Sequence, residues 1–534
     1  MPALPRRYIV VVFLLIFGVL FLTRSSPHAR ERASSPIEED DLSWLSSPGK
    51  DDAPNLNVQP GRSSNHNPFH ERPSSNLFPG SPSLLHPETT ITESSLPLQE
   101  AGVAHVPGFT YFERLYVWNG TIYAVMSEEK QEKFPKLLHV ISKGKDKGTG
   151  ENIDPTDAEM QIITPDEAKR VLGSRAAVIE GTSFILYDTK QFMAHYYHWW
   201  GEIILGTMRI YSSVSLLLNS AHSATSQGSL YMPDPDRFIL PNVLDQGWRD
   251  HAGVNGPLMR AAFPSAAIER RDLWNDLIQI EQPFVLEKGM IISRVAAHKS
   301  PLSAQWAKMI GSTMAATPAT RFWEPVRQRV VNNMIGYVPI QNDAGKVVKP
   351  ISAPSHSSGN PAKPDTSTFG SSRPLVIYVS RQNHGRKLTN EANESLESSM
   401  RGVCETEGLC EFQVAHMEDW PFKDQIEGVS RAVIMIGVHG NGLTHQIWMP
   451  PSSRSTVIEI TYPETYLHDY SMLARNVGHK HYAIWNDTSL TFEEGKTFDG
   501  VEGGTRETFH GDAIPVHGPT VADIVRQRLT ETSH

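Results

Sequence analysis

A glycine-rich run, GVHGNGLTH at residues 437–445, follows an apolar segment and is the motif best suited to binding a ligand. Glycines after a buried strand let a ligand approach the backbone, and N–H groups at the start of a following helix attract phosphate. We therefore predict a nucleotide diphosphate site at His439, Gly440, Asn441 and Gly442. The run is neither a Walker A loop nor a complete GxGxxG fingerprint, and a tight turn that needs glycine only for packing is the alternative.

A basic loop, VSRQNHGRKLTNE at residues 379–391, follows another apolar segment. Its Arg381, Arg386 and Lys387 suit phosphate, because the planar fork of arginine makes two parallel hydrogen bonds to an oxyanion. The alternative is a solvated basic loop. Glu459 in the segment VIEI is interpreted as the acidic partner of ribose hydroxyls, although carboxylates at strand ends are often only surface residues.

The segment HYYHWWGE at residues 195–202 carries a candidate general base. On a helix, His195, His198 and Glu202 lie roughly on one face, with Glu202 one turn beyond His198. A carboxylate beside an imidazole orients the ring and raises its basicity. We predict that His198 is the base, that Glu202 supports it and that His195 lies on the acceptor side. A structural histidine pair and a metal site are the alternatives.

The pair Asp234 and Asp236, separated by one proline, could be a metal-binding DxD motif. Such a motif should follow an apolar strand, but this pair precedes the strand-like segment 237–241. We interpret it as a turn. We also expect no metal site at the only two cysteines, Cys404 and Cys410, because two thiolates without nearby histidines do not supply four ligands.

The elements that must position these residues alternate plainly after residue 373. Apolar strands at 374–381, 433–438 and 455–461 are separated by helical segments, which indicates a doubly wound α/β domain. In such sheets ligands bind at the carboxyl ends of the strands, where the glycine-rich and basic loops begin. Before residue 342, the pattern predicts a hairpin at 112–126 with a turn at Asn119 and Gly120, and a helix at 192–218.

Composition locates the parts of the 534-residue chain that do not fold into these domains. Residues 24–100 and 342–372 are rich in Ser and Pro without a regular period, so we predict a disordered stem and a disordered insertion or linker. The folded body then divides into a domain at 101–341 and a domain at 373–534. The net charge of −10 excludes a general attraction to nucleic acid.

An uncharged apolar run at residues 8–22 follows two arginines and predicts a signal anchor over 8–23, with a cytosolic tail at 1–7 and a lumenal body. A cleaved signal peptide is the alternative. Sequons at Asn119, Asn393 and Asn486 suit a lumenal body. There, Cys404 and Cys410 could close a small disulfide, or they could be two free buried thiols.

In chain order, YYHWWGE, VSRQNHGRKLTNE, GVHGNGLTHQIWMP and STVIEI resemble glycosyltransferase family 61 over about residues 109–484. His195 stands where that family often has Asn. The resemblance implies a GT-B architecture of two facing Rossmann-like domains, the first on the acceptor side and the second binding the nucleotide sugar. It also implies inverting, metal-independent transfer from a UDP-sugar, with xylose or N-acetylglucosamine foremost, to a glycan or glycoprotein hydroxyl.

A type II membrane protein of the Golgi or endoplasmic reticulum, with no cofactor beyond the donor, is the corresponding expectation. Two other classes stay open from the sequence. One is a non-catalytic glycan-binding or scaffold protein of the same fold. The other is a GT-A-type, metal-dependent transferase that uses Asp234 and Asp236.

Overall fold

The structure, a computed structural model, describes residues 88–96, 104–146, 150–222, 233–352, 373–383, 385–491, 501–502 and 511–531. All of them lie in one unit, Ser43–His534. The tail expected at 1–7, the anchor at 8–23 and most of the stem at 24–100 lie outside the described residues. Within the described ranges, no helix combines the length and apolar character that a membrane crossing requires.

The first half of the chain builds a mixed sheet of nine strands among the described residues, in the order β5-β4-β3-β9-β6-β7-β8 with β1 on β6 and β2 on β3. The pairs β4–β5, β6–β9, β6–β7 and β7–β8 are parallel. The strands are β1 (Glu88–Thr90), β2 (His105–Val106), β3 (Phe109–Trp118), β4 (Thr121–Val125), β5 (Met160–Ile163), β6 (Arg175–Leu186), β7 (Arg237–Ile239), β8 (Ala267–Glu269) and β9 (Phe284–Ile292).

The predicted hairpin at 112–126 is confirmed. Strands β3 and β4 pair antiparallel, and Asn119 and Gly120 turn between them with φ of 49° and 80°, the left-handed backbone that two-residue hairpin loops require. The stem, by contrast, was predicted to extend too far. Strand β1 pairs with β6, and its short polar sequence has no periodicity that could have revealed a strand.

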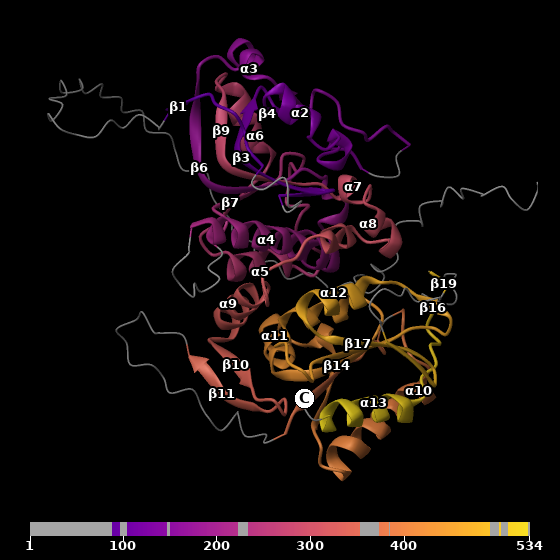
Figure 1. The fold of residues 1–534 in the computed structure, drawn as a ribbon. Coiled ribbons are helices and arrows are strands. Elements are labelled where there is room, and N and C mark those ends of the chain that lie inside the picture. The colour runs from indigo at the N-terminus through magenta and orange to yellow at the C-terminus, as the bar shows by residue number, and fades with distance from the viewer. Residues whose placement is uncertain are drawn as a thin grey trace, which may run out of the picture. The chain divides into compact units, whose positions relative to one another are not determined.

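Helices of the first half surround this sheet (Figure 1). They are α2 (Glu128–Glu132), α3 (Pro165–Val171), α4 (Leu205–His222), α5 (Asn255–Ala262), α6 (Arg271–Gln279), α7 (Arg294–Ala297), α8 (Pro301–Trp306) and α9 (Glu324–Ile335), with the 3-10 turns η3 (Leu137–His139), η4 (Lys190–Phe192) and η6 (Met309–Ala315).

The helix predicted at 192–218 begins later than expected. The π-helix η5 (Tyr197–Ile204) opens it and α4 continues it, so His195 precedes the helix instead of lying on its face. π-Helical turns inside helices are rare and frequently occur at functional sites.

The second half forms the predicted α/β sheet, in the order β13-β12-β14-β15-β17-β18. All neighbours are parallel except β17 and β18. The strands are β12 (Leu375–Val379), β13 (Glu411–Ala415), β14 (Ala432–Val438), β15 (Thr456–Ile460), β17 (Lys480–Trp485) and β18 (Thr488–Thr491), and a separate pair is β16 (Thr465–Tyr466) with β19 (Val501–Glu502).

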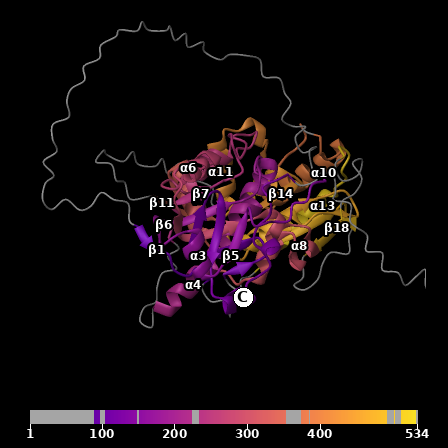
Figure 2. The same ribbon diagram turned by 90° about the horizontal axis from the view of Figure 1, so that it is seen from above.

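Helices cover both faces of this second sheet. On one face, α10 and α13 lie side by side in Figures 1 and 2, packed on Val376 and Tyr378. Ile377 and Val379 point to the opposite face. The helical segments of this half are α10 (Asn390–Arg401), η8 (Gly402–Thr406), η9 (Met417–Asp419), α11 (Phe422–Arg431), η10 (Asn441–Trp448), α12 (Asp469–Val477) and α13 (Gly518–Thr530).

The segment predicted as an insertion at 342–372 is ordered at its start. Strands β10 (Tyr337–Gln341) and β11 (Val347–Ser352) form an antiparallel hairpin, so the prediction is wrong for 347–352. Residues 353–372 lie outside the described residues. Cys404 and Cys410 are joined by a disulfide.

The two halves share one hydrophobic core. Trp200 and Trp323 from the first half pack against Trp448 from the second, with ring centroids 5.3 and 5.9 Å from it. The Trp448 Nε1 group donates to the Tyr196 hydroxyl at 2.7 Å. Because large apolar interfaces restrict relative motion, this packing holds the loops of one half firmly against those of the other.

Candidate active site

The predicted ligand loops meet at the carboxyl edge of the second sheet. Strands β12, β14 and β15 are adjacent and in register, with Val379 opposite Gly437 and Val438 opposite Ile460. Arg381 therefore follows one strand beside His439, which follows the next. This is the edge at which parallel α/β sheets bind ligands.

Two arginines of the basic loop converge on a single backbone carbonyl. Arg381 Nη1 and Arg386 Nη1 donate to the His439 carbonyl oxygen at 3.3 and 2.9 Å, and both side chains are buried. Gly440 makes room for them, because a Cβ there would lie 1.3 Å from Arg381 Nη1. Two buried guanidinium groups at one turn form a strongly positive locus suited to a diphosphate.

Other predicted residues of these loops lie less deeply. Asn441 and Gly442 begin η10, which is a 3-10 helix and not the α-helix expected. Gly442 closely faces Val379, 2.8 Å from a hypothetical Cβ. Lys387 is half-buried, and its carbonyl accepts from the Ile514 N–H at 3.1 Å, so the backbone of this residue is tied to the segment before α13.

Glu459 lies between two histidines. Its Oε1 is 2.5 Å from His439 Nδ1 and its Oε2 is 2.7 Å from His481 Nε2, and the side chain is fully buried. Burial would raise the pKa of Glu459, but the hydrogen bonds from His439 and His481 outweigh it and lower the pKa to about 2. Both oxygens are engaged, so Glu459 orients His439 and does not face a ribose as predicted.

His198 and Glu202 form the predicted pair, at 2.6 Å between His198 Nδ1 and Glu202 Oε2. Glu202 is fully buried and also pairs with Arg294, while its Oε1 accepts from the Met309 N–H at 2.9 Å. Burial would raise the pKa of Glu202, but Arg294 and then His198 hold it well below its usual value. Glu202 is thus a fixed carboxylate that orients the His198 ring.

Arg294 is held in turn by a second carboxylate. The Arg294 N–H donates to Asp188 Oδ2 at 2.5 Å, and its guanidinium lies 4.2 Å from the centre of the Phe192 ring. Burial raises the pKa of Asp188 to about 6, against the opposing hydrogen bonds from Arg294 and its neighbours. His195 also lies here, with its ring centroid 4.9 Å from that of His198.

The two catalytic candidates of the first half adjoin the loops of the second. The Tyr197 N–H donates to Asn441 Oδ1 at 3.1 Å, directly beside His198. Tyr470 contacts both Tyr197 and His439, with ring centroids 5.5 and 5.0 Å away. One aromatic contact chain therefore links the His198 imidazole to the His439 imidazole.

A buried ion pair crosses between the halves at the same place. Lys308 Nζ lies 2.6 Å from Asp469 Oδ1. Burial would raise the pKa of Asp469, but Lys308 and then His439 lower it. Two buried oxygens here, the Tyr197 hydroxyl and Asp469 Oδ2, have no hydrogen-bond partner among the described residues. Buried polar atoms without partners are rare and indicate a bound polar group.

Arg294, Lys308 and Asp469 were not identified from the sequence. Arg294 and Lys308 belong to segments with no motif, and only their contacts with Glu202 and Asp469 reveal them. Asp469 offered one usable signal, because it starts a helix that follows the carboxyl end of β15, where ligand-binding residues of such sheets lie.

The carboxylates of the possible DxD motif are both engaged by the chain. Asp234 pairs with Arg329 at 2.7 Å, and Asp236 Oδ2 accepts from the Thr182 N–H at 2.7 Å. Among the described residues, the side chains grouped closely enough to hold a metal ion are His416, Glu418 and Asp419. Neither Asp234 nor Asp236 belongs to this group.

The three sequons differ in accessibility. Asn119 and Asn486 are exposed residues in tight turns with positive φ. Asn393 lies in α10 and is half-buried, and its amide accepts from the Tyr378 hydroxyl and donates to Glu397, both at 2.9 Å. The structure therefore favours the first two as acceptor sites.

Residues 196–458 match the family model described as Glycosyltransferase 61. The match runs from the Tyr196 end of the histidine segment to β15 and so includes every element of this site except α12. No curated protein matches the chain. The chain belongs to glycosyltransferase family 61, and it is a glycosyltransferase, which takes a sugar donor and a glycan acceptor.

Proposed function

We propose that this family 61 glycosyltransferase is an inverting, metal-independent enzyme that moves a sugar from a UDP-sugar to a hydroxyl group of a glycan or glycoprotein. The observation that carries the proposal is the meeting of two imidazole–carboxylate pairs. His198 with Glu202 comes from the first half and His439 with Glu459 from the second. A GT-B arrangement, with acceptor and donor on opposite halves, accounts for this pairing.

In this proposal the second half holds the diphosphate. Arg381 and Arg386 contact the phosphoryl oxygens and stabilise the negative charge that grows on the departing UDP, the task that a metal ion performs in other transferases. Their convergence at the His439 carbonyl supports this role. Glu459 acts as a positioning residue, because it fixes the His439 ring through Nδ1.

The transferred sugar lies between the halves, where the Tyr197 hydroxyl and Asp469 Oδ2 take its hydroxyl groups as partners. Both atoms are buried and lack hydrogen-bond partners within the described chain, and a pyranose ring presents hydroxyls at suitable spacing for both. Xylose and N-acetylglucosamine are the donors we favour.

His198 acts as the general base. Its Nδ1 donates to Glu202, so the neutral ring keeps Nε2 free of a proton and able to accept one. The acceptor hydroxyl attacks the anomeric carbon and its proton passes to His198 Nε2, while the bond between that carbon and the UDP oxygen breaks. A single in-line displacement inverts the configuration.

The test is transfer by the purified chain with a panel of UDP-sugars in EDTA. We expect activity to survive chelation. We also expect His198→Ala to lower kcat by about 10²- to 10⁴-fold, the usual contribution of a general base, with little change in UDP affinity. His251→Ala, at an exposed histidine away from the site, is the matched control.

Each part of the proposal has its own contrary outcome. Complete loss of transfer in EDTA, restored by manganese, would overturn the metal-independent mechanism. Normal kcat in His198→Ala would remove the proposed base. UDP-sugar binding without transfer or hydrolysis by any donor would instead favour a non-catalytic glycan-binding protein.

We further propose a type II location in the Golgi or endoplasmic reticulum membrane. The apolar run at 8–22, the exposed sequons at Asn119 and Asn486 and the disulfide of Cys404 with Cys410 support it. Glycosidase sensitivity of the native protein would test it, and an unglycosylated protein in the cytosol would contradict it.

A further inference from the structure

A second pocket, about 350 Å³ in volume, lies away from the loops described above. Its walls come from both halves of the chain, namely α4, the segment leading into α9, the segment after η10 and the last turn of α12. Four arginines line it: Arg209, Arg321, Arg327 and Arg475. Glu324 is the one acidic residue among the described residues that line this pocket.

The positive charge of this pocket is not balanced by Glu324. That carboxylate already pairs with Arg327, whose Nε lies 2.9 Å from Glu324 Oε2. Arg209 is buried, and its hydrogen bonds go to uncharged acceptors: the carbonyls of Thr313 and Ala316 and the amide oxygen of Asn476, at 3.1, 3.0 and 3.1 Å. These bonds hold the guanidinium in place without neutralising it.

The cations of the pocket also repel one another. Burial, and then repulsion from Arg475, lower the pKa of Arg209 to about 10. Arg321 and Arg475 are exposed at the mouth. A group of fixed guanidinium groups that disfavour each other's charge becomes more stable when an anion lies between them.

We propose that this pocket binds a small ligand that carries an oxyanion, a sulfate, phosphate or carboxylate group. The guanidinium fork matches the geometry of such groups. The volume falls in the range of ligand sites, about 300 to 1,000 Å³, and exceeds what a single oxyanion fills, so an anionic monosaccharide unit suits it better than a free inorganic ion.

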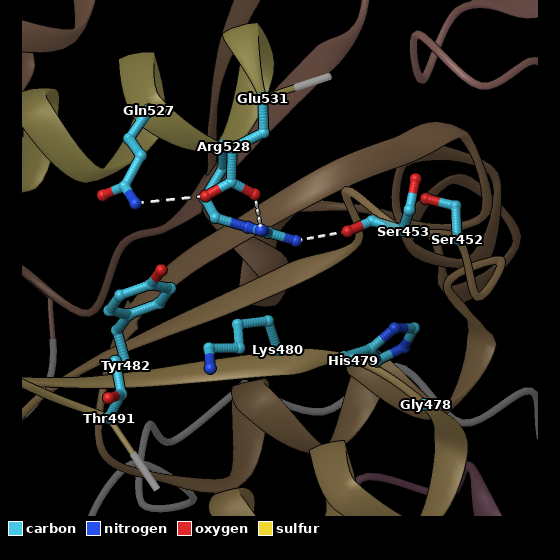
Figure 3. A pocket seen from close by; sticks show the side chains of 10 residues that line it. All are labelled: Ser452, Ser453, Gly478, His479, Lys480, Tyr482, Thr491, Gln527, Arg528 and Glu531. Atoms are coloured by element: carbon cyan, nitrogen blue, oxygen red, sulfur yellow. Dashed lines mark hydrogen bonds and ion pairs between the residues drawn. The ribbon is translucent and has the colours of Figure 1, made fainter. Parts of the chain in front are cut away.

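The neighbouring pocket in Figure 3 shows that the charge pattern is particular to this one. There, Lys480 and Tyr482 on β17 lie opposite the end of α13, and Arg528 pairs with Glu531 on that same helix. That pocket is polar but its charges are largely compensated. The uncompensated arginine group occurs where the two halves meet.

The pocket is separate from the proposed donor site but connected to it through α12. Asp469 begins this helix at the candidate active site, and Arg475 lies six residues later, about 9 Å along the axis. A ligand bound between Arg321 of the first half and Arg475 of the second would also hold the two halves together, and so should raise thermal stability.

The experiment is calorimetric titration of the full chain at constant ionic strength with sodium sulfate, glucuronate and N-acetylglucosamine 6-sulfate, with N-acetylglucosamine as the uncharged control. The variant is Arg321→Gln/Arg475→Gln, at two exposed positions outside the proposed catalytic and donor-binding groups. Arg170→Gln/Arg401→Gln, at two exposed arginines elsewhere, is the matched control.

We expect saturable binding of the anionic probes, weakened at least tenfold in the Arg321→Gln/Arg475→Gln variant and unchanged in the control. UDP affinity should stay the same in both, and saturating UDP should not displace the anion. Tighter binding of the sulfated or uronic sugar than of sulfate identifies a saccharide ligand, whereas equal binding identifies a free anion.

Three results would overturn the proposal. They are the absence of saturable binding, equal affinity in the wild type and the Arg321→Gln/Arg475→Gln variant, and displacement of the anion by UDP. Since UDP affinity is measured alongside, a failure of the anion site is distinguishable from a failure of the proposed donor site.

Discussion

At the scale of single residues, burial decides which titratable groups can take part in chemistry. His198 keeps some exposure, whereas Glu202 is sealed beneath it, so the proton-accepting role falls to the histidine. His445, in the same glycine-rich run as His439, is instead a structural residue. Its Nε2 donates to Gln425 Oε1 at 3.0 Å, and its ring packs on Tyr196.

This burial predicts a specific pH dependence of stability for His445. Burial lowers its pKa from 6.5 to about 4, so the unfolded state binds more protons between these values. The stability contributed by neutral His445 is complete above pH 6.5 and is lost as the pH falls toward 4, at up to about 1.4 kcal/mol per pH unit.

The measurement is urea unfolding of the wild type and of His445→Gln from pH 7.5 to 4.5. The difference in unfolding free energy between the two proteins should shrink as the pH falls. Comparison with the variant cancels Asp188, whose raised pKa acts in the opposite direction. A constant difference across this range would refute the assignment.

At the scale of elements, the turn between β14 and η10 depends on one glycine. Gly440 has φ of 148°, and a Cβ there would overlap the Arg381 guanidinium. Gly440→Ala should therefore displace Arg381 from the His439 carbonyl and weaken UDP binding at least about tenfold, or about 1.4 kcal/mol. Calorimetric titration with UDP measures this.

Gly402→Ala is the control for that substitution. A Cβ at Gly402 meets nothing within 4 Å, and its φ of −55° is helical, so UDP affinity should not change. Equal UDP affinity in Gly440→Ala and the wild type would show that Arg381 does not contact the diphosphate.

At the scale of the whole molecule, function depends on how the halves are joined. The Tyr197 N–H donates across the junction to Asn441 Oδ1. Asn441→Ala leaves that buried donor without its partner, which should cost about 1 to 3 kcal/mol of unfolding free energy. Asn441→Asp keeps an acceptor oxygen and should cost less.

Urea unfolding of both Asn441 variants tests this, with UDP-sugar hydrolysis as the functional measurement. Equal destabilisation by Asn441→Ala and Asn441→Asp would mean that the hydrogen bond does not join the halves. Destabilisation of the kind expected, with a parallel loss of hydrolysis, would tie the junction to the reaction.

The second half of the fold was predictable because its signals are local. Apolar strands such as 433–438 are buried on both faces, and glycine and basic loops follow their ends. The hairpin at Asn119 and Gly120 was predictable for the same reason. The strand at Glu88–Thr90 and the hairpin strand at Val347–Ser352 were not, because polar or proline-containing strands form only when a partner strand is present.

The sequence by itself determined the parallel sheet, the convergence of Arg381 and Arg386 near the glycine turn, and the pairing of His198 with Glu202. These features depend on neighbours in sequence or on the rule that strand ends share one edge. Only the tertiary structure decided that Arg294 fixes Glu202, that Glu459 orients His439, and that Lys308 meets Asp469. Such contacts join segments distant in the chain, and long-range packing leaves no local pattern from which they could be read.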